Sequence, residues 1–209
     1  MANNAAKHTD EYFAKLKETL DKLDRKKIEE VVDALMNAYK NDKQVFMFGN
    51  GGSAALASHF AVDLGKGTIS GCEPWDKGIM RGKKRFKVFC LNDNIPSMTA
   101  WANDSSYENI FAEQLENLVN KGDLVIGVSG SGNSPNVLNA IKLANEKGAV
   151  TVGLTGYEGG KLKGLAKICL VVPVNSMRMI EDVHLILEHM ITQYIYEEFK
   201  TAFLPRSKS

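Results

Sequence analysis

Apolar residues recur at helical spacing through the first 41 residues of the chain. They fall at positions 12, 16, 20 and 23, and then at 28, 31, 32, 35 and 39. A repeat of three to four residues predicts amphipathic helices, each with one apolar side. The pattern is weakest between Leu20 and Arg25, so we predict two helices with a break there.

Beyond residue 41, five short apolar runs alternate with helical periodicity. The runs cover residues 45–48, 88–91, 124–128, 150–154 and 168–172, and each is bounded by Gly, Asn, Asp or Lys. Near-continuous apolar strands separated by helices are typical of a parallel sheet that is covered on both faces. We therefore predict an α/β fold with a doubly wound, five-stranded parallel sheet, flanked by helices near residues 54–64, 97–119, 135–147 and 180–199.

These elements predict one domain over residues 1–209, with an N-terminal helical segment (1–41), an α/β core (42–199) and a tail (200–209). The last helix of the core is apolar on nearly all sides, which indicates burial on more than one side. Either it lies at a subunit interface, which is the interpretation we favour, or it is a central helix of the monomer. The chain is therefore expected to form a homo-oligomer.

Composition narrows the function classes. Apolar residues make up 44% and charged residues 24%, and 26 basic against 25 acidic residues leave a net charge of +1. This balance gives no electrostatic footprint for nucleic acid or an anionic membrane, so neither partner is expected. Residues 65–87 are rich in Gly and Lys and are expected to form an irregular connection. The basic run at 81–85 within it is more typical of a solvated loop than of a phosphate or nucleic-acid contact.

Cysteine usage and apolar run lengths indicate the compartment. Cys72, Cys90 and Cys169 are far apart and form no CxxC pair, so a disulfide framework or Cys-rich zinc site is not expected. The first twenty residues carry no signal-peptide-like apolar run, and no run reaches the ~18 residues of a membrane span. We therefore expect a cytoplasmic protein with reduced thiols.

Two loops combine glycine and serine directly after predicted strands. The first is Gly49–Ala55 (GNGGSAA) and the second is Ser129–Pro135 (SGSGNSP). Glycines let the backbone approach a ligand, and a helix N-terminus that follows offers N–H groups and a positive dipole end to an anion. Pro135 suits the first helical turn, with Ser134 as its N-cap.

The residue types in these loops indicate a sugar phosphate as the anion. Hydroxyls and backbone N–H groups are present, but the GxxxxGK[ST] motif of P-loop NTPases is absent from the sequence. Either loop alone could be an ordinary tight turn. Two such loops at strand ends of one sheet favour a ligand crevice. A further Gly-rich segment at 155–160 is interpreted as a turn.

Histidines and carboxylates cluster on two of the predicted helices. His59 and Asp63 lie four residues apart, and the last helix carries Glu181, His184, Glu188 and His189. Such groups could hold a divalent ion, or act as general acid and base without a metal. They could also be charged and core positions of ordinary amphipathic helices, and the spacing alone favours this third interpretation.

Four segments resemble one known family. They are FGNGGSAALASHFA at 48–61, SGSGNSPN at 129–136, LTGYEGGKL at 154–162 and IEDVHLILEH at 180–189. The first two resemble the sugar isomerase (SIS) domain, and the last two its phosphoheptose isomerase branch. The resemblance implies a homotetramer with active sites between subunits, a bound Zn²⁺, and interconversion of sedoheptulose 7-phosphate and D-glycero-D-manno-heptose 7-phosphate, for heptose-containing glycoconjugates.

The resemblance also implies roles for individual residues. Asp63 and His189 would be the catalytic acid–base pair that moves a proton through an enediolate. The residues implied to bind substrate are Asn50, Gly51, Gly52, Ser53, Asn92, Asp93, Ser129, Gly130, Ser131, Ser134 and Glu181. The implied metal ligands are His59, Asp63, Glu181 and His189.

The sequence departs from the family pattern at three positions. Asp63 stands where the family has Glu, Glu181 where it has Gln, and Arg178 where it has Asp. These changes leave two alternatives open. One is a non-catalytic SIS protein that binds a protein partner, as the replication-initiator-associating type does. The other is a SIS isomerase or sensor for a different sugar phosphate.

Overall fold

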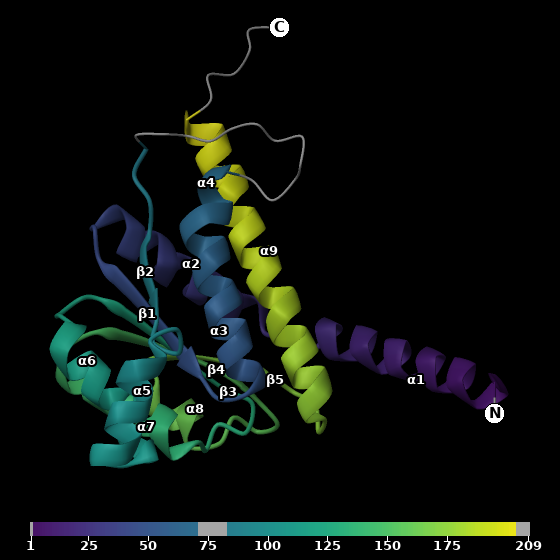
Figure 1. Ribbon diagram of the computed structural model, residues 1–209. Coiled ribbons are helices and arrows are strands. Elements are labelled where there is room, and N and C mark those ends of the chain that lie inside the picture. The colour runs from purple at the N-terminus through teal and green to yellow at the C-terminus, as the bar shows by residue number, and fades with distance from the viewer. Residues whose placement is uncertain (1, 71–82, 204–209) are drawn as a thin grey trace, which may run out of the picture.

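Five parallel strands form one sheet in the computed structural model, which describes residues 2–70 and 83–203 (Figure 1). The strands are β1 (Gln44–Gly49), β2 (Lys87–Cys90), β3 (Leu124–Ser129), β4 (Val150–Gly156) and β5 (Ile168–Val172). Their order across the sheet is β2-β1-β3-β4-β5, and every pairing is parallel. The predicted doubly wound sheet is confirmed.

Helices cover both faces of this sheet. Before β1 lie α1 (Ala2–Asp21) and α2 (Arg25–Lys40), and after it α3 (Gly52–Val62), the π-helical turn η1 (Asp63–Gly67) and α4 (Thr68–Ser70). Between β2 and β3 are α5 (Ile95–Asp104), the 3₁₀ turn η2 (Tyr107–Asn109) and α6 (Ala112–Leu118). The remaining helices are α7 (Pro135–Glu146), α8 (Leu162–Leu165) and α9 (Met177–Phe203).

Three local features follow from identifiable residues. The predicted break between the first two helices is confirmed, and the Asp24 carboxylate caps α2 by accepting from the backbone N–H groups of Lys26 and Lys27. The helix predicted at 97–119 is divided, because the backbone at Ser105 and Ser106 leaves the helical region. Residues 65–70 are helical and not irregular as predicted. Cys72 and residues 81–82 of the basic run lie outside the described residues.

Alternating side chains of the strands build a core on each face. In β1, Val45 and Met47 pack with α2, α3 and α9, whereas Phe46 and Phe48 pack with the helices around α7. All four side chains are fully buried. A strand buried on both faces explains the near-continuous apolar runs of the sequence.

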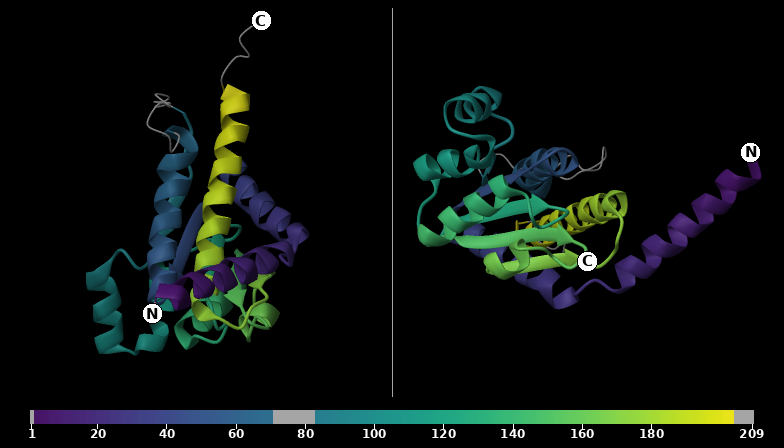
Figure 2. Two further views of the ribbon diagram at one scale, coloured as in Figure 1. Left: turned by 90° about the vertical axis from the view of Figure 1, so that its right-hand side faces the viewer. Right: turned by 90° about the horizontal axis from the view of Figure 1, so that it is seen from below.

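Helix α9 runs beside α3 across one face of the sheet, and the first half of α1 projects away from the body (Figure 2). One side of α9 is buried against the core through Ile180, Val183, Leu187, Ile191 and Ile195. Another side leaves large apolar groups exposed, namely Leu185, Ile186, Met190 and Tyr194. The helix therefore contributes one side to the core of the monomer, and its other apolar side is exposed on the surface.

Burial also determines the state of the two described cysteines. Cys90 and Cys169 are free thiols. Burial raises the pKa of Cys90 to about 12 and that of Cys169 to about 11, so both stay protonated at neutral pH. Within residues 2–70 and 83–203, none of the helices combines the length and apolar content that crossing a bilayer requires. The cytoplasmic location stays a prediction.

Candidate active site

The two glycine- and serine-rich loops meet at the point in the sheet where the order of the strands reverses. Strands β1 and β3 are neighbours, but the chain leaves β1 toward β2 on one side and β3 toward β4 on the other. Ligands of open α/β sheets bind in the crevice at such a switch point, outside the carboxyl ends of the strands. The topology therefore brings both predicted loops to one crevice.

A pocket of about 280 Å³ occupies this crevice. Both loops and the start of α9 contribute to its wall. The lining residues are Asn50, Gly51, Gly52, Ser53, Val128, Ser129, Gly130, Ser131, Ser134, Met177 and Glu181. Most of the predicted substrate-binding residues are thus brought together, with Glu181 joining them from a distant part of the chain.

Two positions of the first loop require glycine for identifiable structural reasons. Gly51 has φ +54° and ψ −121° at the N-cap of α3, a conformation that side chains strongly disfavour. A Cβ on Gly52 would lie 2.6 Å from Oε1 of Glu181, which is closer than Cβ atoms approach other atoms in proteins. The bare backbone at Gly52 therefore lets the Glu181 carboxylate reach the loop.

The second loop gathers three hydroxyls at the start of α7. Oγ of Ser129 lies 3.0 Å from Oγ of Ser134 and 3.5 Å from Oγ of Ser131. Ser134 occupies the predicted N-cap position, but its side chain makes no capping hydrogen bond. Its hydroxyl belongs to the pocket instead. Hydroxyls at a helix N-terminus form a suitable binding site for an anion.

Reciprocal amide contacts connect the two loops. Asn50 Nδ2 donates to Asn136 Oδ1 over 2.9 Å, and Asn136 Nδ2 donates to Asn50 Oδ1 over 2.8 Å. The Tyr107 hydroxyl also donates to Asn50 Oδ1. Asn136 is buried, so its amide holds the first loop against the first turn of α7.

The Gly-rich segment after β4 packs against the second loop, Ser129–Pro135, and holds it through backbone hydrogen bonds. Gly156 N–H donates to the carbonyl of Gly130, and Leu162 N–H donates to the carbonyl of Gly132. A Cβ on Gly132 would lie 2.1 Å from the carbonyl oxygen of Gly159, so the two turns contact through bare backbone. The segment is a turn, as predicted, and it positions the second loop.

Two predicted substrate residues lie apart from the pocket lining. The Asn92 side chain is engaged with Gly49, accepting from its N–H over 3.1 Å and donating to its carbonyl over 3.0 Å. It fixes the end of β1, from which the first loop starts. Asp93 is exposed. Direct contact of either residue with a sugar stays a prediction.

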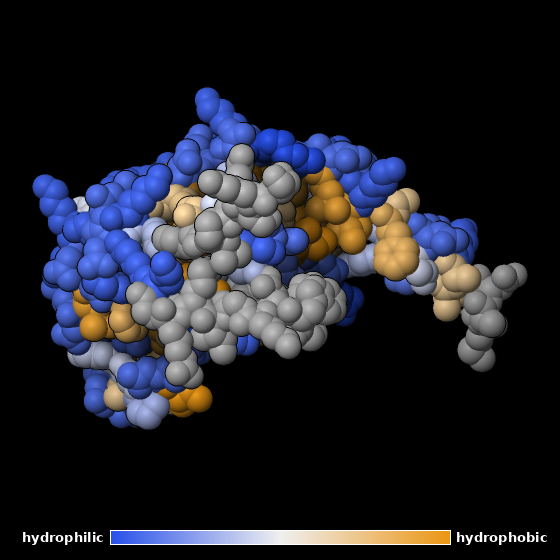
Figure 3. All heavy atoms as spheres, turned by 90° about the horizontal axis from the view of Figure 1, so that it is seen from above, coloured by the Kyte–Doolittle hydropathy of each residue, from blue (hydrophilic) through white to orange (hydrophobic). Residues whose placement is uncertain are grey.

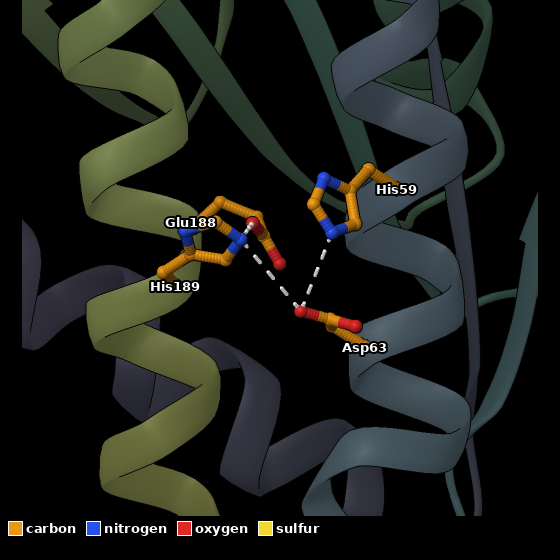
Figure 4. A group of neighbouring side chains, drawn as sticks. All are labelled: His59, Asp63, Glu188 and His189. Atoms are coloured by element: carbon orange, nitrogen blue, oxygen red, sulfur yellow. Dashed lines mark ion pairs between the residues drawn. The ribbon is translucent and has the colours of Figure 1, made fainter. Parts of the chain in front are cut away.

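A second group of polar side chains lies between α3, η1 and α9 (Figure 4). Nε2 of His59 is 3.6 Å from Oδ2 of Asp63, and Nε2 of His189 is 4.0 Å from the same oxygen. The two imidazole rings are 5.0 Å apart and nearly perpendicular. The structure thus brings together His59, Asp63 and His189 as predicted. Asp63 is the first residue of η1, and π-helical turns are frequent at functional sites.

Glu188 completes this histidine–carboxylate cluster, by which we mean His59, Asp63, Glu188 and His189. One potential ligand atom from each of the four residues lies within 4.8 Å of the others. Glu188 is 1% exposed, and neither carboxylate oxygen has a hydrogen-bond partner among the described residues. Burial, together with the neighbouring Asp63 carboxylate, raises the pKa of Glu188 to about 8.

The four predicted polar residues in the first half of α9 therefore face three environments. Glu181 reaches the serine pocket, Glu188 and His189 face α3, and His184 points into the core. Nε2 of His184 lies 3.1 Å from the Thr155 carbonyl oxygen, and burial lowers the pKa of His184 to about 4. His184 is consequently neutral and structural.

Arg178 lies exposed at the start of α9, near the contact between α1 and α9. Its charge acts on the phenol of Tyr12, which hydrogen-bonds to the Asp182 carboxylate. That hydrogen bond is the main reason why the pKa of Tyr12 is raised. The structure thus associates Arg178 with the contact between these helices.

The serine pocket and the histidine–carboxylate cluster lie along the same pair of helices. Helices α3 and α9 both start at the carboxyl ends of the strands and run side by side in the same direction (Figures 1 and 2). Gly52 precedes His59 by seven residues, and Glu181 precedes Glu188 by seven. Seven residues advance about 10 Å along a helix. The two groups are therefore about two turns apart.

The cluster fits a divalent cation. Two imidazoles and two carboxylates are ligands that Zn²⁺ accepts, and a cation beside a buried carboxyl group that makes no hydrogen bond favours its charged form. The group that the structure gathers contains Glu188 and not Glu181, whose carboxylate lies beside Gly52. Metal ligation by Glu181 stays a prediction. The sequence does contain a signal for the role of Glu188, because this charged residue falls among the apolar residues on the buried side of α9.

Comparison with known proteins gives consistent matches. Residues 11–156 match the SIS domain. The chain is 40% identical to a phosphoheptose isomerase from Aliarcobacter butzleri, over 90% of this chain and 92% of that protein. It is 35% identical to the Helicobacter pylori phosphoheptose isomerase, over 88% of this chain and 90% of that protein. The solved phosphoheptose isomerase from Neisseria gonorrhoeae matches with a TM-score of 0.79 at 29% identity, covering 93% and 98% of the two chains.

Proposed function

Because the chain belongs to the SIS-domain family, as predicted, we propose that it is an aldose–ketose isomerase converting sedoheptulose 7-phosphate into D-glycero-D-manno-heptose 7-phosphate. The relatives named phosphoheptose isomerase support this substrate. The observation that carries the proposal is the placement of an anion pocket and an acid–base cluster at two points along one pair of helices.

In this proposal the phosphate binds at the serine pocket. The hydroxyls of Ser129, Ser131 and Ser134 donate to phosphate oxygens, and the N-termini of α3 and α7 favour the negative charge. Anchoring the phosphate holds the sugar chain in one orientation. It contributes to the rate by positioning, away from the bonds that react.

The distance between pocket and cluster supports a long sugar chain. In a staggered chain, single bonds of about 1.5 Å advance about 1.3 Å each, so the seven bonds from C2 of a heptulose to its phosphorus span about 9 Å. That length is close to the two-turn separation along α3 and α9. A triose phosphate, with three such bonds, would reach less than half of it.

Proton transfer is assigned to two residues of the cluster. The Asp63 carboxylate takes the proton from the carbon beside the carbonyl, and His189 exchanges a proton with the substrate oxygen as the enediolate forms and collapses. Both side chains are accessible, since Asp63 is 18% and His189 is 52% exposed. Each such group is worth about 10²–10⁴ in rate.

We propose one Zn²⁺ per site, held by His59, Asp63 and His189 together with a further carboxylate. When bound, the ion stabilises negative charge that develops on the substrate oxygens. His59 is 45% exposed, and Asp63 lies between both histidines. Cation binding there would also neutralise the like charges of Asp63 and Glu188.

We further propose a homo-oligomer, a tetramer as the resemblance implies. An apolar groove of about 380 Å³ lies between α2 and α9 and is lined by Ile28, Glu29, Val32, Asp33, Met190 and Tyr194. Hydrophobic surface also lies in the angle between the body and α1 (Figure 3), and Phe13 on α1 is 62% exposed. Each copy of the chain carries both the groove and the apolar side of α1. The α1 helix of one subunit can therefore cover the groove of another.

Nuclear magnetic resonance with sedoheptulose 7-phosphate tests the activity. Purified protein with added Zn²⁺ is expected to produce the aldoheptose phosphate, and Asp63→Asn or His189→Ala to slow this at least about a hundredfold. Asp21→Asn, which changes an exposed carboxylate at the end of α1, is the matched control. No aldoheptose phosphate from the wild type would exclude the proposed reaction.

A thermal-shift panel of sugar phosphates tests the substrate class separately. Ligands that bind the native state raise the apparent melting temperature according to their affinity. We expect the largest shift with heptose 7-phosphates. A larger shift with hexose or amino-sugar phosphates would instead favour an isomerase or sensor for another sugar.

A further inference from the structure

We propose that Glu188, and not Glu181, supplies the second carboxylate to the bound divalent ion, and that Glu181 instead contacts the sugar phosphate. The inference rests on the proposed function and concerns a division of labour between two acidic residues of α9. The resemblance to the family places the ligand at position 181. The contacts of the chain's own residues favour position 188.

The surroundings of Glu188 favour ligation. Its carboxylate is enclosed between α9 and α3, with no protein hydrogen-bond partner within the described part of the chain. Its Oε2 lies 3.3 Å from Nε2 of His189. An enclosed carboxylate that makes no hydrogen bond is costly to keep charged, and a cation between it and the imidazoles removes the cost.

Distances within the cluster are close to those that an ion needs. Ligand atoms of a tetrahedral site with bonds of about 2.05 Å lie about 3.4 Å apart. The observed separations are 3.3 Å from Glu188 to His189, 3.6 Å from Asp63 to His59 and 4.0 Å from Asp63 to His189. Small rotations of exposed imidazole rings therefore suffice to enclose an ion.

The position of Glu181 favours a different role. Its carboxylate lies against the backbone of Gly52, at the wall of the serine pocket and about two turns before His189. Helical side chains lean toward the N-terminus, so Glu181 leans away from the cluster on its own chain. A carboxylate there can accept hydrogen bonds from sugar hydroxyls near the bound phosphate.

Metal binding to the apoprotein separates the two carboxylates, with Zn²⁺ alone as the probe. We compare Glu188→Ala with the matched variant Glu181→Ala, after circular dichroism has shown that both fold. Alanine removes every donor atom, whereas glutamine at position 181 would restore the residue of the family pattern. Competition with a chromophoric chelator measures affinity. We expect Glu188→Ala to weaken Zn²⁺ binding at least about a hundredfold and Glu181→Ala to leave it close to wild type. The visible spectrum of the Co²⁺-loaded protein should change only in Glu188→Ala.

The sugar-phosphate thermal shift without metal gives the complementary readout, and there Glu181→Ala should lose more of the shift than Glu188→Ala. Weaker Zn²⁺ binding in Glu181→Ala, or unchanged binding in Glu188→Ala, would overturn the inference, as would a wild type that binds no Zn²⁺. These measurements do not depend on turnover. If Zn²⁺ binding follows Glu188 in a protein without isomerase activity, the inference holds and the proposed reaction fails.

Discussion

Replacing His184 by glutamine should make the protein's stability less sensitive to acid. His184 is 1% exposed, and burial lowers its pKa from 6.5 to about 4. Below pH 6.5 the unfolded chain therefore binds a proton at this position that the folded protein does not take up until about pH 4. The contribution of neutral His184 is complete above pH 6.5 and is lost as the pH falls toward 4.

The size of this effect follows from the shift in pKa. One pKa unit corresponds to about 1.4 kcal/mol, so wild type should lose roughly 3 kcal/mol more than His184→Gln between pH 7 and pH 4. The glutamine amide can still donate to the Thr155 carbonyl, which keeps the hydrogen bond that His184 makes. Any packing loss in the variant is independent of pH and cancels from the comparison.

Urea unfolding at several pH values measures the free energy of unfolding of both proteins. Protein concentration is held constant and a chelator is present, so that metal binding and association do not vary. His8→Gln, at an exposed histidine of α1, is the control and should follow wild type. Parallel wild-type and His184→Gln curves between pH 7 and pH 4 would show that His184 does not resist protonation.

Three further changes test the pocket and the apolar side of α9. Asn136→Ala removes the partner of Asn50 and should cost about 1–2 kcal/mol in urea unfolding and weaken sugar-phosphate binding. Gly51→Ala strains a backbone at φ +54° and should cost about 1–3 kcal/mol by thermal unfolding, whereas Gly164→Ala, in α8 with open space around it, should not destabilise. Tyr194→Glu should shift the sedimentation coefficient toward the monomer, and an unchanged coefficient would place the subunit contact elsewhere.

The sheet and the serine pocket could be predicted because their signals are local. Apolar runs mark the strands, and the rule that ligands bind at the carboxyl ends of parallel strands joins two loops that are 80 residues apart in sequence. His59 and Asp63 are one helical turn apart, so their proximity follows from the helix alone. Such inferences need no knowledge of which helix faces which.

The remaining features depend on packing between elements. Glu181 and Glu188 share one face by periodicity, and only the position of α3 against α9 decides which carboxylate meets His59. The same packing turns His184 into the core. The π-helical start at Asp63 also depends on tertiary context, because helical periodicity in a sequence does not reveal an inserted residue.

The side-by-side arrangement of α3 and α9 has a consequence for how this fold could change its substrate. Backbone geometry, and not side-chain size, sets the gap between the anchored end of a ligand and its reacting end. A point substitution in the pocket wall alters which groups are tolerated but leaves that gap as it was. Accepting a sugar shorter by several carbons would require the histidines to move up one turn on both helices at once, so chain length should diverge more slowly among relatives than stereochemical preference.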